Sequence, residues 1–528
     1  MESIIKPASN EMIKALDAEF EARKNTIRAT KSEWTLKDGG TVYYISEKGS
    51  DAGDGKTPET AFATCKNINE DGLLKEGDVV LFERGGRWHD RIRCKPGVTY
   101  SAYGEGDKPK ICGSIDASGR DDWTECKSMP GIYKYAHELR GNPLNPNGKY
   151  GAILYDTGNI IFNDGEAYGL RVYPENIDTK LTCLMGMNGL VSNGKDMWYR
   201  PVSKCEGPED LHHDLEYYAD IVTGEVYLMS VYGNPGERFE RIDLAAKDGP
   251  VIRAANGVTI DNLAVLYGSA HGIGSGTCSD LTVRNCEIGW IGGAVQGASS
   301  THVTRYGNAI EIYGVGQNFF VTNCYIYQAF DCGPTVQWGG DLDKEDPRRG
   351  LKKHNKHIRF CGNAIERCDS PLEVWITTNT KPTPEKYAKL EDIVLSDNLC
   401  RYSGYGFGGF THYKADYNMF YGGGHTEAEY ADAYMENNFF WHARLYIPYA
   451  VPTHTENGKG FNWRNNVIIK PYGSEFGLLG SEPENAKGGT KCYYYTNETI
   501  KMLTECGALG DNKYYEHMRS EDERFNCI

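Results

Sequence analysis

The sequence predicts an all-β fold, a right-handed parallel β-helix, on two observations. The first is a five-residue pattern of apolar, any, apolar, any, and then Asn, Asp or Gly. It occurs seven times: Val258–Asn262, Leu281–Asn285, Phe319–Asn323, Ile358–Gly362, Ile393–Asp397, Ala433–Asn437 and Phe461–Asn465. The second is spacing, since the final residues of these copies are 23, 38, 39, 35, 40 and 28 positions apart. A repeat of this length is typical of a solenoid.

Each copy has the form of one corner of a solenoid coil: a short alternating strand, a turn residue, and a second short strand. In such a coil the inward side chains stack on those of the next coil, about 4.8 Å away, and the turn amides can pair along the stack. An antiparallel β-sandwich also has short alternating strands, but it gives no reason for the same turn residue in every unit. The longer repeats are expected to carry loops, which collect on one face of a constant frame.

The elements follow in order along the chain. Residues 1–40 are expected to form a helical cap over the open end of the solenoid, because Ser9 or Asn10 can cap a helix with Ile13, Leu16 and Phe20 near one face. Residues 41–115 are predicted to form the first coils, and 251–480 the main β-helix with its catalytic groove. Between them, 116–250 lose the repeat and are expected to form an inserted, β-sandwich-like module. Residues 481–528 are predicted to be a C-terminal cap with a short helix near Glu498–Cys506.

The composition of the chain excludes several classes of binding partner. A net charge of −16 without a basic block argues against nucleic acid or an anionic membrane surface, and no apolar run is long enough to span a membrane. The first thirty residues lack the apolar core of a secretion signal. Many of the 16 cysteines occupy strand-like positions and none forms a CxxC pair, which favours reduced core thiols in a cytoplasm. An oligosaccharide is the expected partner, and the oligomeric state is left open.

A second strand follows the turn in each coil, and three of these strands can be aligned. They are Ala309–Tyr313, Thr335–Trp338 and Pro371–Trp375. Alternation then puts three polar side chains, Glu311, Gln337 and Glu373, in one outward column. Tyr313 and Trp375 are expected to lie beside this column with flat faces for a sugar ring, and Trp338, at an inward position, joins them as a candidate substrate contact.

Acidic residues gather on these coils. Glycoside hydrolysis requires two carboxyl groups that flank the bond to be broken. Asp331 lies in the turn before the Gln337 strand, and Asp369 occupies a similar turn one coil later. We predict that Glu311, Asp331 and Glu373 supply the catalytic pair, with the third acid holding substrate or tuning a pKa. Neither a metal nor a cofactor is expected.

Two long loops add further candidates. Gly289–Asn308 contains His302 and Arg305, and Gly339–His357 carries acidic and then basic side chains. The acidic part lacks the glycine and distal glutamate of a calcium loop. Arg305 and His271 are expected to contact substrate hydroxyls at the same edge.

These repeats resemble the pectin-lyase-like superfamily of right-handed parallel β-helices over about 41–115 and 251–480. With its acidic column and early insertion, the chain also resembles glycoside hydrolase family 120, the β-xylosidases, and the β-helix lacto-N-biosidases. The resemblance to glycoside hydrolase family 120 implies two catalytic carboxylates on neighbouring coils. Glu373 matches one of them, whereas Gln337 stands where the other acid would be.

The resulting hypothesis is a glycoside hydrolase that removes terminal units from imported oligosaccharides. A polysaccharide lyase is the alternative, because Arg305 and the basic stretch Arg348–His357 could neutralise a uronic acid during elimination. A non-catalytic glycan-binding solenoid is the third possibility, and it predicts no close pair of carboxylates.

Overall fold

A computed structural model of the chain describes sixteen segments. They are residues 5–139, 156–172, 207–220, 223–246, 249–298, 303–305, 307–338, 353–376, 388–407, 420–421, 428–443, 448–449, 462–471, 477–480, 491–494 and 511–517. The predicted helix near Glu498–Cys506, His302 and the charged stretch 341–352 lie outside these segments.

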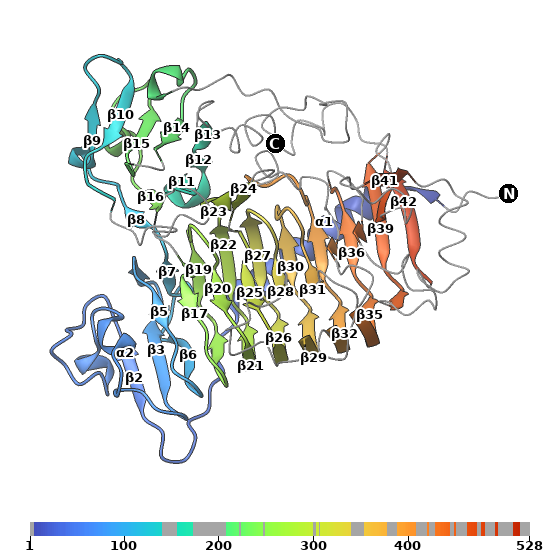
Figure 1. Ribbon diagram of the computed structural model, residues 1–528. Coiled ribbons are helices and arrows are strands. Elements are labelled where there is room, and N and C mark those ends of the chain that lie inside the picture. The colour runs from blue at the N-terminus through green and yellow to red at the C-terminus, as the bar shows by residue number, and fades with distance from the viewer. Residues whose placement is uncertain are drawn as a thin grey trace.

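The chain winds through three long sheets, which confirms the predicted parallel β-helix (Figure 1). Each coil passes from sheet B to sheet A and then to sheet C, and every pairing between coils in these sheets is parallel except β40 with β41. Sheet B contains β2 (Val42–Ile45), β3 (Val79–Glu83), β6 (Thr99–Tyr103), β18 (Thr259–Asp261), β21 (Cys278–Arg284), β26 (Gly316–Thr322), β29 (Lys353–Cys361), β32 (Ala388–Ser396), β35 (Ala428–Glu436) and β38 (Asn462–Arg464).

Sheet A contains β4 (Arg87–Trp88), β7 (Lys110–Cys112), β19 (Ala264–Leu266), β22 (Glu287–Ile291), β27 (Tyr325–Ala329), β30 (Ala364–Glu366), β33 (Leu399–Arg401), β36 (Phe439–Trp441), β39 (Val467–Pro471), β42 (Lys513–His517) and β1 (Ile5–Ala8). Sheet C contains β5 (Ile92–Arg93), β17 (Ile252–Arg253), β20 (Ile273–Ser275), β25 (Ile310–Tyr313), β28 (Pro334–Trp338), β31 (Glu373–Ile376), β34 (Phe420–Tyr421), β37 (Pro448–Tyr449), β40 (Gly477–Gly480) and β41 (Lys491–Tyr494).

The turn from sheet B to sheet A explains the repeated residue. All seven turn residues have positive φ, between 50° and 70°. Glycine, asparagine and aspartate tolerate this left-handed conformation better than other residues do, so each copy of the pattern ends in one of them. Apolar side chains at the two alternating positions point inward and form one continuous core along the solenoid.

The expected amide ladder is present, but one residue later than predicted. Its members are Asn363, Asn398, Asn438, Asn466 and Asn512. The first four are buried, and each of them donates a hydrogen bond to the next member. The residues before the first four members adopt the left-handed turn conformation. In the preceding coils the ladder positions hold Leu263, Cys286 and Cys324 instead.

Helix α1 (Asn10–Ala29) forms as predicted, with Ser9 accepting a hydrogen bond from the Met12 amide at its N-terminus. It does not close the open end of the solenoid, which corrects the expectation. Instead its apolar stripe packs along the outer face of sheet A, over Tyr325, Leu399 and Trp441. The edge of that sheet is extended by β1, which pairs with β42.

Between the first and the main coils lies the inserted module, at the upper left in Figure 1. One of its sheets contains β9 (Trp123–Glu125), β10 (Ile132–Tyr135), β15 (Val226–Met229), β14 (Glu216–Ala219) and β13 (Leu170–Val172); the other contains β8 (Ile115–Asp116), β16 (Ile242–Ala245), β11 (Asn159–Phe162) and β12 (Ala167–Tyr168). The sheets share one apolar core, which includes Tyr217 and Leu228 from one and Phe162 and Leu244 from the other. The module is therefore sandwich-like.

The eleven cysteines in the described segments are free thiols, and nine of them are buried. This agrees with the prediction of reduced core thiols, since several of them stack inside the solenoid. Within the same segments, no helix combines the length and the apolar character needed to span a bilayer.

Candidate active site

The register of sheet C defines the acidic column. Glu311 on β25 pairs with Thr335 on β28, and Thr335 pairs with Glu373 on β31. Thr335 therefore stands between the two glutamates, and Gln337 belongs to the neighbouring column with Tyr313 and Trp375. The predicted alignment was wrong by two residues in β28. A shift of two preserves which side chains face inward, so the alternating pattern could not detect it.

Asp331 and Glu373 come together at the turn from sheet A to sheet C, on neighbouring coils. One carboxylate oxygen of each lies within 4.8 Å of the other, and both lie within 4.8 Å of the Cys332 thiol. Cys332 Sγ is 3.3 Å from Asp331 Oδ1 and 3.0 Å from Glu373 Oε2, so the thiol bridges the two acids. All three side chains are buried.

Glu373 accepts further hydrogen bonds from its own sheet. The Thr335 hydroxyl donates to Glu373 Oε1 at 2.6 Å, and the Gln337 amide donates to the same oxygen. These donors hold the carboxylate in one orientation.

Glu311 is held by residues of adjacent turns. The Asn308 amide donates to Glu311 Oε2, while Asn308 Oδ1 accepts the Cys332 amide N–H at 3.3 Å. His271 Nδ1 lies 3.4 Å from Glu311 Oε2. Asn308 thereby connects the Glu311 carboxylate to the turn that carries Asp331.

Arg305 supports the turn beside these acids. Its Nε donates to the Gly293 carbonyl oxygen at 2.7 Å, and its guanidinium lies 4.1 Å from the centre of the Phe330 ring. Arg171 of the inserted module donates to the same carbonyl and also binds Asp156 through both its Nη atoms. The module and the β23–β24 hairpin (Val295–Ala298, Val303–Arg305) thus meet at Gly293, next to the acidic turn.

The other predicted residues lie on the same coils. Tyr313 is exposed, and Gln337 contacts Glu373 as described. Asp369 is buried, and the pairing of Cys332 with Ser370 places it one coil beyond Asp331. Trp338 and Trp375 have described backbones in β28 and β31, and their side chains lie outside the described part of the chain.

Three residues that contact the acids were missed by the sequence analysis: Cys332, Thr335 and Asn308. Cys332 was counted only as a core thiol, and Thr335 was displaced by the register error. Asn308 stands three residues before Glu311, which was the only available indication that the two side chains interact. Short polar side chains next to turn acids are common, so sequence alone gave no reason to choose these.

Acids elsewhere on the coils are bound differently. Glu287 binds Arg28 through both oxygens, and Glu366 binds Arg401 at 2.8 Å. Such pairs neutralise the acid and fix packing. For Glu373 the hydrogen-bond donors among the described residues include the Thr335 hydroxyl, the Gln337 amide and the Cys332 thiol.

Comparisons with known proteins give low-identity structural matches only. No family model and no curated protein matches the chain. Among solved structures, a complex of XylC with xylose is 11% identical to this chain and has a TM-score of 0.36. The match covers 90% of this chain and 83% of the XylC chain. A glycoside hydrolase is 11% identical, with coverages of 76% and 97% and a TM-score of 0.31. The GH136 lacto-N-biosidase from Eubacterium ramulus is 12% identical, with coverages of 97% and 71% and a TM-score of 0.31. The lacto-N-biosidase resemblance found in the sequence thus recurs among these structures.

Proposed function

We propose that the protein is a glycoside hydrolase whose catalytic pair is Asp331 and Glu373. The observation that carries the proposal is the approach of their carboxylate oxygens to within 4.8 Å at a turn between neighbouring coils. Glycoside hydrolysis needs two carboxyl groups at one bond, one as acid and one as base or nucleophile.

The separation favours retention of configuration. Retaining enzymes hold their two carboxyl groups about 5–5.5 Å apart, whereas inverting enzymes leave about 6.5–9.5 Å for a water molecule. The nearest carboxylate oxygens of Asp331 and Glu373, within 4.8 Å of each other, are closer to the retaining range than to the inverting one. The second acid then attacks the anomeric carbon directly, and water releases the sugar in a second step.

The surroundings of the two acids support separate roles. Glu373, oriented by hydrogen bonds from Thr335 and Gln337, serves as the nucleophile. Asp331 is contacted by the Cys332 thiol and serves as the acid that protonates the leaving oxygen. Glu311, bound by Asn308 and next to His271, holds a substrate hydroxyl.

For the substrate we propose oligosaccharides, with release of a terminal unit. The supporting observation is that the repeats containing β25, β28 and β31 are among the longest of the solenoid, so their loops can close a pocket around a chain end. The reducing environment implied by the free thiols suits a cytoplasmic enzyme acting on imported sugars.

The test is hydrolysis of nitrophenyl glycosides and oligosaccharides by the whole chain and its variants. Glu373→Gln and Asp331→Asn are expected to lower kcat on the order of 10³-fold or more, because each removes one member of the pair. Glu391→Gln, which changes a surface acid on β32 paired with Lys389, is the control and should leave activity unchanged. Equal activity in all variants would contradict the assignment.

Rescue of alanine variants by azide distinguishes the nucleophile from the acid. Glu373→Ala with added azide should form a glycosyl azide of inverted configuration if Glu373 is the nucleophile, since azide occupies the vacated space. Asp331→Ala should instead give an azide product of retained configuration. An ultraviolet-absorbing unsaturated product that survives both substitutions would establish a lyase.

A further inference from the structure

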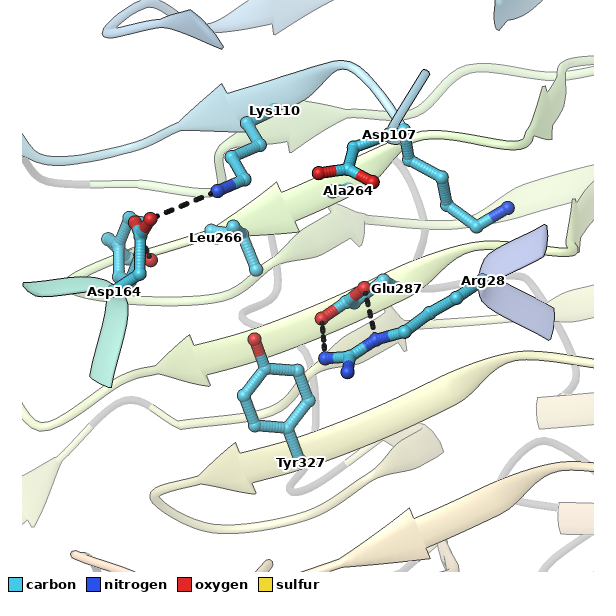
Figure 2. Close-up of a pocket in the computed structure, with 10 residues that line it drawn as sticks. Arg28, Asp107, Lys110, Asp164, Ala264, Leu266, Glu287 and Tyr327 are labelled. Atoms are coloured by element: carbon cyan, nitrogen blue, oxygen red, sulfur yellow. Dashed lines mark hydrogen bonds and ion pairs between the residues drawn. The ribbon is translucent and has the colours of Figure 1, made fainter. Parts of the chain in front are cut away.

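A cavity of about 230 Å³ lies on the outer face of sheet A, and its lining does not include Asp331 or Glu373 (Figure 2). Its lining comes from helix α1, the loop before β7, the inserted module and four strands of sheet A. The residues are Arg28, Asp107, Lys108, Lys110, Asp164, Ala264, Leu266, Tyr267, Glu287 and Tyr327. A cavity made by separate parts of a chain at a junction between modules is a frequent place for a ligand.

Small outward residues of the sheet create the space. Ala264 and Leu266 of β19 lie at its floor, and Gly289 of β22 follows Leu266 in register. A Cβ on Gly289 would lie 2.2 Å from the Tyr327 ring, so only glycine lets that ring lie against the sheet. The cavity thus has a flat aromatic and apolar side, which suits the C–H face of a small ring.

Charged groups of both signs surround this floor. Three acids and three bases line the cavity, so their formal charges cancel. Two ion pairs are already formed: Arg28 binds Glu287 through Nε and Nη2, and Lys110 lies 3.2 Å from Asp164. Figure 2 shows these pairs on opposite sides of Leu266, with the Tyr327 hydroxyl pointing between them.

We propose that this cavity binds a single neutral sugar ring. Sugar hydroxyls both donate and accept hydrogen bonds, so they can bridge an intact ion pair, donating to its carboxylate and accepting from its cation. A free amino acid or phosphate would have to compete with the pairs already formed, because its full charges need the same partners. A volume of about 230 Å³ is below the range of drug-sized pockets, which fits one ring and excludes a longer chain.

The site is separate from the proposed catalytic pair and does not depend on it. Its residues belong to sheet A, the helix and the inserted module, whereas Asp331 and Glu373 belong to the turn into sheet C. A sugar bound here would fasten α1, the sandwich-like module and the first coils together. We therefore expect bound sugar to stabilise the protein.

The experiment measures binding by the whole chain, using calorimetry and thermal unfolding with xylose, glucose, galactose and N-acetylglucosamine, and with glycine and inorganic phosphate for comparison. At least one sugar is expected to bind and raise Tm. Ala264→Met, which fills the floor, and Glu287→Gln, which removes an acceptor, should each weaken binding at least about tenfold. Glu105→Gln is the matched control, since it changes an exposed acid of the same loop that pairs with Lys31.

Asp331→Asn should bind the same sugar with unchanged affinity, which distinguishes this cavity from the proposed active site. The proposal is overturned if no sugar binds, or if binding is lost in Asp331→Asn but kept in Ala264→Met and Glu287→Gln. Binding of glycine or phosphate in place of every sugar would also overturn it.

Discussion

The outer face of sheet A differs between the early and the late coils. From β27 onward its outward side chains include Tyr325, Ala364, Leu399, Trp441 and Ile469, and these pack against α1. On the earlier strands the same columns hold Lys110, Ala264 and Glu287, where α1 ends and the polar cavity begins. The face is mainly apolar where α1 covers it, with the Glu366–Arg401 pair also buried there, and it is charged around the cavity.

The interior differs in the opposite direction, since polar side chains are buried in the late coils and apolar ones in the early coils. The late coils have the buried asparagine ladder, whereas the early coils have Leu263, Cys286 and Cys324 at its positions. Asn363, Asn398, Asn438 and Asn466 each bond to main-chain groups and to the next asparagine, so the late coils are joined by side chains as well as by strand pairing. The late coils therefore depend on specific polar contacts, and the early coils depend mainly on apolar packing.

The largest loss of stability is expected from a substitution under α1, where the helix covers the late coils. Phe20 is fully buried, packs edge-on against Tyr325 and Trp441, and lies 3.9 Å from the Arg401 guanidinium. Phe20→Ala should lower the free energy of unfolding by about 3–5 kcal/mol, measured by urea denaturation. Glu19→Ala on the exposed side of the helix is the control. A loss below about 1 kcal/mol for Phe20→Ala would mean that the helix contributes little to the coils it covers.

A smaller loss of stability is expected when an asparagine of the ladder is substituted. Asn398 makes hydrogen bonds to Asn363, Asn438 and the Phe360 carbonyl, and Asn398→Ala leaves these buried groups without that partner. The expected loss is about 2–3 kcal/mol. Cys324→Ala, the matched change in an early coil, should cost about 1 kcal/mol or less, because the thiol makes only weak contacts. Equal losses would remove the distinction between the two sets of coils.

The smallest effect concerns a buried cation of the early coils. Burial lowers the pKa of Lys108 from 10.5 to about 8, and its ammonium donates to Asn262 Oδ1 at 2.6 Å. The unfolded chain then binds more protons than the folded protein between pH 8 and 10.5, so this group makes stability rise with pH in that window. Lys108→Met should therefore stabilise the protein by about 1 kcal/mol below pH 8, with the gain vanishing toward pH 10.5.

Urea denaturation of both proteins at pH 7.5 and 9.5 measures this difference. Arg84 also donates to Asn262 Oδ1, so that acceptor stays bonded in the variant. Lys31→Met, an exposed lysine, is the control and should show no such pH dependence. A gain that does not change between the two pH values would contradict the lowered pKa.

The sequence by itself determined the solenoid, the turn positions and the side chains that face inward. These follow from local rules: a left-handed turn selects Asn, Asp or Gly, and a strand alternates its two faces. It also identified Glu311, Asp331 and Glu373 as acids of neighbouring coils, since the repeat brings the same part of each coil to one edge.

Only the tertiary structure decided which side chains meet. A two-residue shift in β28 put Thr335 in place of Gln337 between the glutamates without disturbing the alternation. The apolar stripe of α1 required a partner surface, but its pattern did not distinguish the open end from the side of sheet A. The cavity, too, combines Arg28, Asp164 and Glu287 from distant parts of the chain. Contacts between residues far apart in the sequence depend on register and packing, which a pattern of neighbouring residues does not contain.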